Sequence, residues 1–197
     1  MRKLVVLTFV SLDGVMQAPG GKGEDPSGGF DLEGWVVRYF DETLGDEMTR
    51  QMSQPFDLLV GRKTYEIFAT YWPHQSSDEP INKAKKYMVS NEAIQTGWEE
   101  TIQIDGDVVA EIEKLKQQDG PMLQVHGSSH LIQTLLANDL VDELWLKVFP
   151  VTLGKGKRLF GEGTVPAAFR LTEAKPSPSG VIIASYKRDG EVKFGSF

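Results

Sequence analysis

The chain has 197 residues, with 21 Lys and Arg against 28 Asp and Glu, and therefore a formal net charge of −7. This length fits one domain that buries a hydrophobic core without covalent cross-links. The absence of cysteine excludes disulfide scaffolds, thiolate zinc sites, iron–sulfur clusters and a cysteine nucleophile, and the acidic balance argues against a nucleic-acid partner.

The N-terminal segment does not read as a targeting signal. It is apolar only over Leu4–Val10, with Thr8 interrupting the run, whereas a secretory signal needs a longer apolar core and a small-residue cleavage site. No apolar run approaches the roughly 20 residues that a bilayer requires. We therefore expect a cytoplasmic protein with no membrane association.

Strand patterns recur along the chain at intervals that leave room for helices. The expected strands are Leu4–Val10, Phe56–Val60, Lys86–Ser90, Thr101–Ile104, Met122–His126 and Glu143–Phe149. After Pro150 the pattern changes, and two strands, Phe169–Ala174 and Val181–Arg188, follow with no helix between them. This order predicts a mostly parallel sheet with an antiparallel C-terminal edge.

Helical patterns fill the intervals between these strands. The expected helices are one carrying Val36, Phe40, Leu44, Met48 and Met52 at steps of four, a short one near Thr64, one from Asp107 to Gly120, and one capped by Ser128 or Ser129. Residues 19–34 hold six glycines in sixteen positions, which predicts a mobile loop. We expect one α/β domain over residues 1–197, with helices on both faces of its sheet.

The turn after the second strand has the composition of a phosphate site. Gly61 lets the backbone approach a ligand closely, and the helix that follows presents unpaired amides. Arg62 and Lys63 add positive charge, and the Thr64 hydroxyl can cap the helix or donate to phosphate. An ordinary strand-to-helix turn with two solvated cations fits the same four residues, because a motif this short often occurs by chance.

A second such turn follows the strand that ends at His126. Gly127, Ser128 and Ser129 suit a pyrophosphate or nicotinamide contact, or a plain serine cap. His126 and His130 are spaced four apart, but a zinc site needs more ligands than this segment offers, so we expect no metal. Rossmann and P-loop fingerprints are absent. The basic stretch of residues 154–158 fits a substrate phosphate or, as we favour, a solvated or subunit-contact loop.

Together these segments resemble the dihydrofolate reductase-like superfamily. Within it, the chain is most similar to the reductase domain that forms the C-terminal half of bacterial riboflavin-biosynthesis deaminase–reductases. The segments that carry the resemblance are Ser11–Met16, Leu59–Glu66, Tyr71–Pro73, Met88–Asn91, Gln124–Ser128 and Phe149–Phe160. They occur in family order and span nearly the whole chain, and the Gly-Arg-Lys-Thr segment is the most specific of them.

The resemblance implies NADPH as the cofactor. Gly61, Arg62, Lys63 and Thr64 would hold phosphates, and Arg62 with Ser90 and Asn91 would lie at the adenosine end and recognise the 2′-phosphate. The remaining implied contacts are Gly127, Ser128 and Ser129 at the pyrophosphate and nicotinamide, and Phe9, Asp13, Gly14 and Met16 beside the nicotinamide ring. Arginine–phosphate contacts are charge-assisted, so Arg62 is the expected leading affinity residue.

The resemblance also implies where substrate and acid would lie. Dihydrofolate reductases carry a carboxylate in the helix before the Gly-Arg-Lys-Thr strand, and spacing makes Asp46 the nearest candidate here. Trp35, Trp72 and Phe149 are candidates for the walls of the substrate site, or for the core. One departure is that Gly127 stands alone where the family often has two or three glycines in a row.

Three functions remain open at this stage. The leading hypothesis is an NADPH-dependent reductase resembling 5-amino-6-(5-phosphoribosylamino)uracil reductase, which acts on a pyrimidine or related heterocycle. The alternatives are dihydrofolate reduction and a non-catalytic NADPH-binding sensor. The resemblance further implies a small-molecule substrate and a homodimer.

Overall fold

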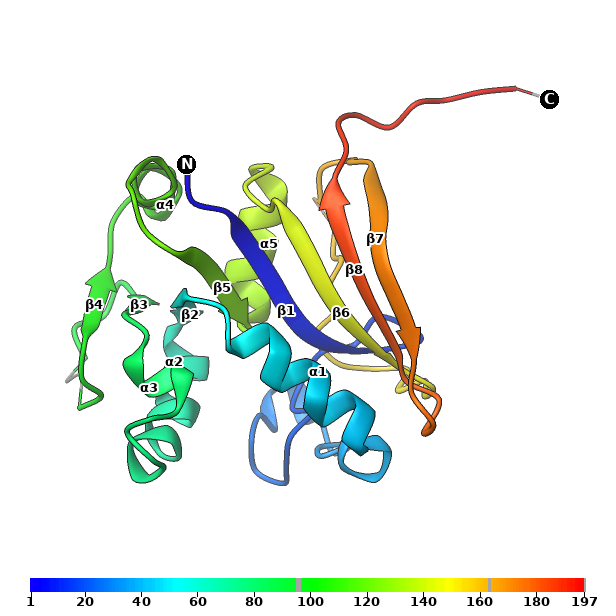
Figure 1. The fold of residues 1–197 in the computed structure, drawn as a ribbon, viewed down its shortest axis with the longest axis horizontal. Coiled ribbons are helices and arrows are strands. Elements are labelled where there is room, and N and C mark those ends of the chain that lie inside the picture. The colour runs from blue at the N-terminus through cyan, green and yellow to red at the C-terminus, as the bar shows by residue number, and fades with distance from the viewer. Residues whose placement is uncertain (95–96, 163, 197) are drawn as a thin grey trace.

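The computed structural model describes residues 1–94, 97–162 and 164–196. These residues form one eight-stranded sheet in the order β4-β3-β2-β5-β1-β6-β8-β7 (Figure 1). The strands are β1 Leu4–Ser11, β2 Phe56–Gly61, β3 Lys86–Val89, β4 Thr101–Ile104, β5 Met122–His126, β6 Glu143–Phe149, β7 Phe169–Pro176 and β8 Ile182–Arg188. Neighbours from β4 to β6 are parallel, and β8 is antiparallel to both β6 and β7. The predicted α/β fold with an antiparallel edge is confirmed.

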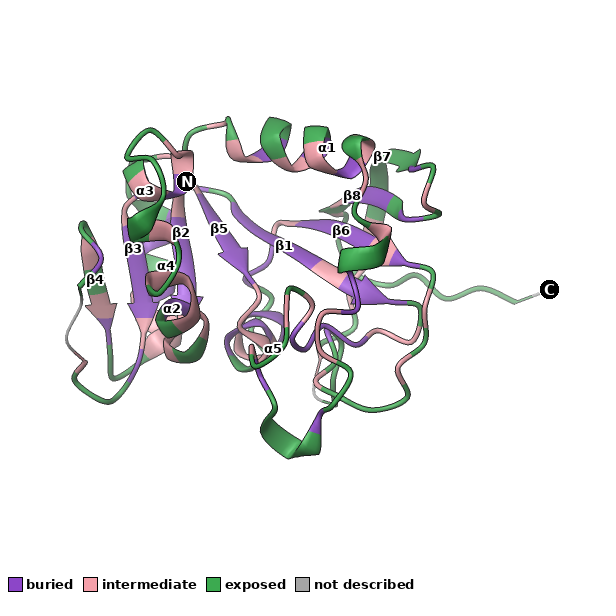
Figure 2. Ribbon diagram, turned by 90° about the horizontal axis from the view of Figure 1, so that it is seen from below, coloured by how far each residue is buried: buried purple, intermediate pink, exposed green. Residues whose placement is uncertain are grey.

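Helices cover both faces of this sheet, as expected. Their bounds are α1 Glu42–Met52, α2 Arg62–Ala69, α3 Pro80–Lys83, α4 Val108–Gln117 and α5 Ser129–Ala137, with short 3-10 turns at Ser27–Gly29, Val37–Tyr39 and Trp72–His74. Figure 2 shows α1 on one side of β1 and α5 on the other. The α1 side also carries α2 and α3, which pack on Leu58 and Val60 of β2.

The alternation of β1 explains why both faces are apolar. Leu4 and Val6 pack with α4 and α5, while Val5 and Leu7 point to the opposite side, toward Met48 of α1. All four side chains are at most 3% exposed. A strand buried on both sides is expected at the centre of a parallel sheet, and β1 lies between β5 and β6.

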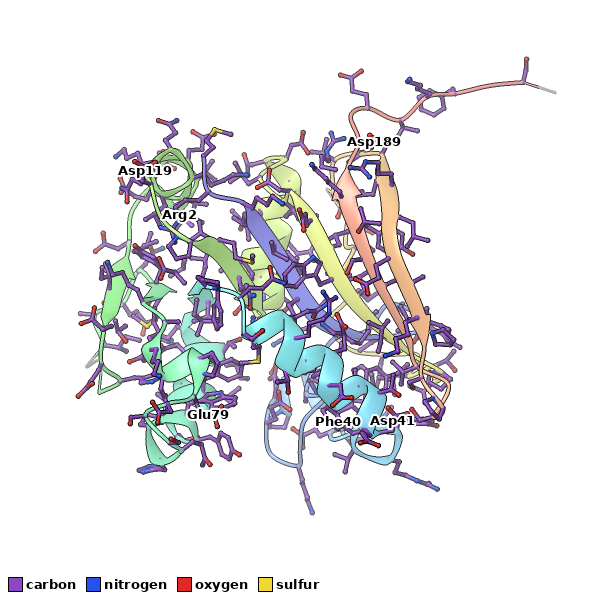
Figure 3. The ribbon with its side chains drawn as sticks, viewed as in Figure 1. Arg2, Phe40, Asp41, Glu79, Asp119 and Asp189 are labelled. Carbon is purple, nitrogen blue, oxygen red and sulfur yellow. The ribbon has the colours of Figure 1, made fainter. Side chains whose placement is uncertain are left out.

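The helix expected from Val36 onward begins later than its apolar spacing predicts. Val37–Tyr39 is a 3-10 turn and Phe40 is extended, so the helix starts only at Glu42. The cause is Asp41, whose carboxylate accepts a hydrogen bond from the Leu44 amide at 2.9 Å and caps the first turn. Figure 3 labels Phe40 and Asp41 at this end of α1.

The glycine-rich loop of residues 19–34 is organised by its own acidic side chains. The Glu33 carboxylate accepts hydrogen bonds from the amides of Gly23 at 2.7 Å and Asp25 at 2.9 Å. Gln17, just before the loop, donates from its side chain to the carbonyls of Asp25 and Ser27. These bonds hold the loop beside the carboxyl ends of the parallel strands.

Candidate functional site

A cavity of about 690 Å³ opens at the carboxyl ends of β1, β2 and β5. Its walls come from β1, the glycine-rich loop, one side of α1, and the first turns of α2 and α5. Ligands of open α/β sheets collect at this edge, where helix N-termini point toward the strand ends. The cavity is therefore the candidate site.

The first glycine turn lies in the wall of this cavity. Gly61, Arg62, Lys63 and Thr64 all line it. Among the described residues, no side chain caps the first turn of α2. The amides of that turn are therefore left for a ligand, and the helix dipole favours an anionic one.

The second glycine turn is bonded to the first. Gly127 and Ser128 both have left-handed backbones, with φ of 59° and 65°. A serine in this conformation is strained relative to glycine. Its Oγ accepts a hydrogen bond from the Gly61 amide at 2.9 Å, which accounts for a serine where the family often has another glycine.

Basic side chains near the two turns already have acidic partners. Arg62 pairs with Glu92 on the loop after β3. Lys63 and Lys157 both bond to Asp25, and these contacts hold the pKa of Asp25 well below its usual range against the effect of burial. Lys157 was expected in a solvated or subunit-contact loop, but it lines the cavity instead.

The carboxyl groups at the cavity differ from the one expected. Asp46 is exposed and does not line the cavity, so this geometry gives it no route to protonate a bound ligand. The reason lies in how α1 is rotated, because Leu44, Glu47 and Gln51 face the sheet. Glu24 on the loop does line the cavity, and burial raises the pKa of its carboxyl group.

One side of the cavity is an apolar chamber between the sheet and the helices α1 and α2. It is formed by Leu7, Phe9, Met48, Met52, Phe68 and Trp72. His126, at the end of β5, also lines it and is only 7% exposed. Burial, followed by the nearby Lys147 charge, lowers the pKa of His126 to about 3, so the ring is neutral.

The structure brings most of the predicted site residues to the cavity. Those that line it are Phe9, Met16, Gly61, Arg62, Lys63, Thr64, Trp72, Gly127, Ser128 and Ser129. Those that do not are Asp13, Gly14, Trp35, Asp46, Ser90, Asn91 and Phe149.

Asp13 and Gly14 belong to a turn that holds two loops together. The Asp13 carboxylate accepts hydrogen bonds from Ser11 Oγ and from the amides of Leu153 and Gly154. These bonds, the Ser11 contact first, lower the pKa of Asp13 to about 2. Its role here is to join the chain after β1 to the chain after β6.

Ser90 and Asn91 lie in the loop that carries the partner of Arg62. Ser90 is buried, and its hydroxyl donates to the Glu92 carbonyl and accepts from the Glu92 amide. It therefore shapes this turn, while Asn91 is exposed.

Trp35 and Phe149 are core residues. Their rings meet edge to face at 5.4 Å, and Phe149 has no exposed surface. The Trp35 indole donates to the Gln17 carbonyl at 2.8 Å, so both side chains are satisfied inside the protein. Of the three predicted wall residues, Trp72 is the one that borders the cavity.

Several cavity residues escaped sequence reasoning. Glu24 and Asp25 sit among glycines in the loop, and Met48 and Met52 belong to the predicted apolar stripe of α1. The sequence signal for His126 is its position at a strand end, directly before Gly127. The described residues contain no cluster of three or more His, Asp or Glu side chains that could hold a metal ion. None of the helices in the described ranges is long and apolar enough to cross a membrane.

Comparison with known proteins gives the chain relatives over nearly all its length. A model of the family described as the RibD C-terminal domain matches residues 2–183. The uncharacterized Bacillus subtilis proteins YyaP and YwjB are 26% and 27% identical, over 96% and 88% of this chain and 96% and 91% of their own.

Solved structures share the fold at lower identity. A Shewanella protein assigned by name to riboflavin biosynthesis has a TM-score of 0.67 and 24% identity, covering 96% of this chain and 99% of its own. A pyrimidine reductase-like protein from Corynebacterium diphtheriae gives 0.64 at 14%, covering 96% and 93%. Enterococcus faecalis dihydrofolate reductase, solved with NADP(H), gives 0.62 at 12%, covering 95% and 96%. These likenesses show a dihydrofolate reductase-like fold.

Proposed function

Because the chain belongs to the RibD C-terminal domain family, we propose that it is an NADPH-dependent reductase whose substrate is a pyrimidine or related heterocycle. The observation that carries this proposal is one continuous cavity with two unlike ends. Two glycine turns border one end, and the apolar chamber forms the other. The phosphates of a dinucleotide need the polar end, and its flat reactive ring and the flat acceptor need the apolar end.

The residues at the polar end fit the phosphates of NADPH. The first turns of α2 and α5 have no side-chain caps among the described residues, so their amides can donate to phosphate oxygens. Arg62 is 40% exposed at the cavity edge, where it can exchange Glu92 for the 2′-phosphate. This exchange would give the preference for NADPH over NADH.

The residues at the other end fit the reacting rings. NADPH supplies the hydride when it is bound, and the protein's task is to orient the partners and exclude water. Phe9 and Met16 border this region, and the chamber offers flat apolar walls. Glu24 lines the same cavity and is the proposed proton donor, since burial raises the pKa of its carboxyl group although the carboxylate accepts hydrogen bonds from the amides of Gly20 and Gly21.

Dihydrofolate reduction is the less favoured activity. The resemblance places the dihydrofolate reductase carboxylate on the helix that corresponds to α1. In this chain the α1 residues that line the cavity are Met48 and Met52, and Asp46 is exposed. A bound pteridine would therefore meet thioethers where that enzyme offers a carboxylate.

Two measurements test the proposal. Titration with NADPH and with NADH, followed by tryptophan quenching, should show saturable binding and a preference for NADPH. Cofactor oxidation should then be followed with the ribosylaminopyrimidine phosphate and with dihydrofolate in parallel. Turnover of the pyrimidine supports the proposal, turnover of dihydrofolate alone replaces it, and binding without any turnover favours a sensor.

The cellular place and assembly of the protein are part of the same proposal. We propose a cytoplasmic homodimer, as the family resemblance implies. Light scattering coupled to size-exclusion chromatography tests the assembly, and a mass matching one 21.9 kDa chain would reject the dimer.

A further inference from the structure

A chain of buried hydrogen bonds anchors His126 from behind. Gln124 is fully buried two residues earlier on β5, and its Nε2 donates to the Gln51 carbonyl of α1 at 3.1 Å. The Oε1 of Gln124 lies 2.9 Å from Nε2 of His126. Gln51 is itself held, since its side-chain amide donates to Glu47 at 2.6 Å and accepts from Lys147. The His126 ring is therefore fixed in place by groups outside the cavity.

These partners determine which ring nitrogen of His126 carries the proton. The Gln51 carbonyl can only accept, so the amide nitrogen of Gln124 must face it. This leaves the Gln124 oxygen, also an acceptor, facing Nε2 of His126. Nε2 is consequently the donor. A neutral imidazole has a single N–H, so Nδ1 carries a lone pair and can only accept.

The second nitrogen of His126 has no hydrogen-bond partner among the described residues. Nδ1 of His126 makes no hydrogen bond to any residue that the structure describes. Within the described ranges, Thr164 Oγ1 is the one side-chain nitrogen or oxygen atom that is both fully buried and without a hydrogen-bond partner. Since Nδ1 of His126 also lacks a partner, it is not fully buried and is open to the cavity that the ring lines. The surroundings are apolar, with Phe56 stacked at 6.1 Å and Phe68 edge-on at 6.4 Å.

We propose that His126 is a specificity-determining residue whose Nδ1 accepts a hydrogen bond from an N–H group of the ligand in the chamber. The substrate class is then a heterocycle that presents an amino or lactam N–H to this wall. A ligand with an alkyl group or an acceptor there leaves a buried lone pair unpaired, which binding sites discriminate against strongly. The inference rests on the proposed function for the ligand being a heterocycle.

Two isosteric fragments test the inference without turnover. The amino group of 4-aminopyrimidine and the methyl group of 4-methylpyrimidine have similar size, but only the first donates. Dissociation constants from chemical-shift titration, at a pH where both are neutral, should favour the amino compound by about tenfold in the wild type. His126→Phe should bring the ratio close to one. His126→Asn, which can still offer an amide oxygen, should keep a preference.

Control measurements separate the possible failures. His74→Phe replaces an exposed histidine that does not line the cavity and should leave the ratio unchanged. Long-range ¹H–¹⁵N correlation on the unliganded wild type should show His126 protonated at Nε2, whether or not the variants fold. A proton on Nδ1, no binding of the amino compound, equal binding of the pair, or a ratio that survives His126→Phe overturns the inference. Absence of saturable NADPH binding in the same samples rejects the proposed reductase while the ratio still judges His126.

Discussion

The two ends of the cavity are built in different ways. At the polar end, Gly61 to Thr64 and Gly127 to Ser129 come from two short segments, each a strand running directly into a helix. At the apolar end, the walls come from β1, α1, α2 and the turn at Trp72, which only packing across the sheet brings together. Local geometry thus defines the end suited to phosphate, and tertiary packing defines the chamber.

The largest expected effect tests which carboxyl group serves the chamber. Glu24→Gln should lower kcat by about 10²–10⁴-fold, because it removes the proposed general acid and keeps the shape of the side chain. Asp46→Asn is the matched control on the exposed side of α1, and its rate should equal that of the wild type. Steady-state kinetics of both variants checks this. A rate loss in Asp46→Asn alone would contradict the role of Glu24 and would indicate that Asp46 on α1 is the acid.

The next effect separates aromatic residues of the core from those of the chamber. Phe149→Ala should cost about 3–5 kcal/mol of unfolding free energy, since its ring is fully buried against Trp35 and Phe9. Trp72→Ala should weaken ligand binding with a smaller loss of stability, because Trp72 borders the cavity. Urea unfolding and NADPH titration of each variant provide the measurements. Equal losses of stability would contradict the assignment of Phe149 to the core and of Trp72 to the cavity wall.

At the polar end, Arg62→Ala should weaken NADPH by about tenfold to a hundredfold, the worth of a hydrogen bond between charged groups. NADH lacks the 2′-phosphate and should lose much less. Arg170→Ala removes an exposed arginine on β7 away from the cavity and serves as the control. Equal losses for the two cofactors would contradict the assignment of Arg62.

The last effect is a slope of stability with pH, and it concerns the buried Lys147, which bonds to Gln51 behind the chamber. Burial lowers the pKa of Lys147 to about 7 from its ordinary 10.5, so between these pH values the unfolded chain binds more protons than the folded one. Stability from this residue should therefore rise as pH increases from 7 to 10.5, by at most about 1.4 kcal/mol per pH unit. Urea unfolding of wild type and Lys147→Met across this window measures it. The same slope in both proteins would show that Lys147 does not titrate there.

The sequence predicted the strands, the sheet and both glycine turns because each depends on signals a few residues long. It did not predict that Asp46 lies outside the cavity, because α1 turns Gln51 toward the sheet, and the Gln51 partner Lys147 lies 96 positions further along the chain. No residue near Asp46 in the sequence indicates the contact between Gln51 and Lys147. Phe149 and Trp35 were weighed as walls or core, and only their edge-to-face packing settles them as core. No local sequence pattern predicts that Glu24 lines the cavity, because its position depends on how the glycine-rich loop folds.

The hydrogen bond between Gly61 and Ser128 has a consequence for the energetics of binding. It joins two turns that are 67 positions apart in sequence. The proposed phosphate-binding site, which both turns form, is therefore assembled when the chain folds. A dinucleotide would then find its amides already oriented, and little conformational entropy would remain to be lost on association. Ser128 accepts a left-handed backbone to make this bond. Local strain in the free protein is thus exchanged for a binding surface that needs no rearrangement.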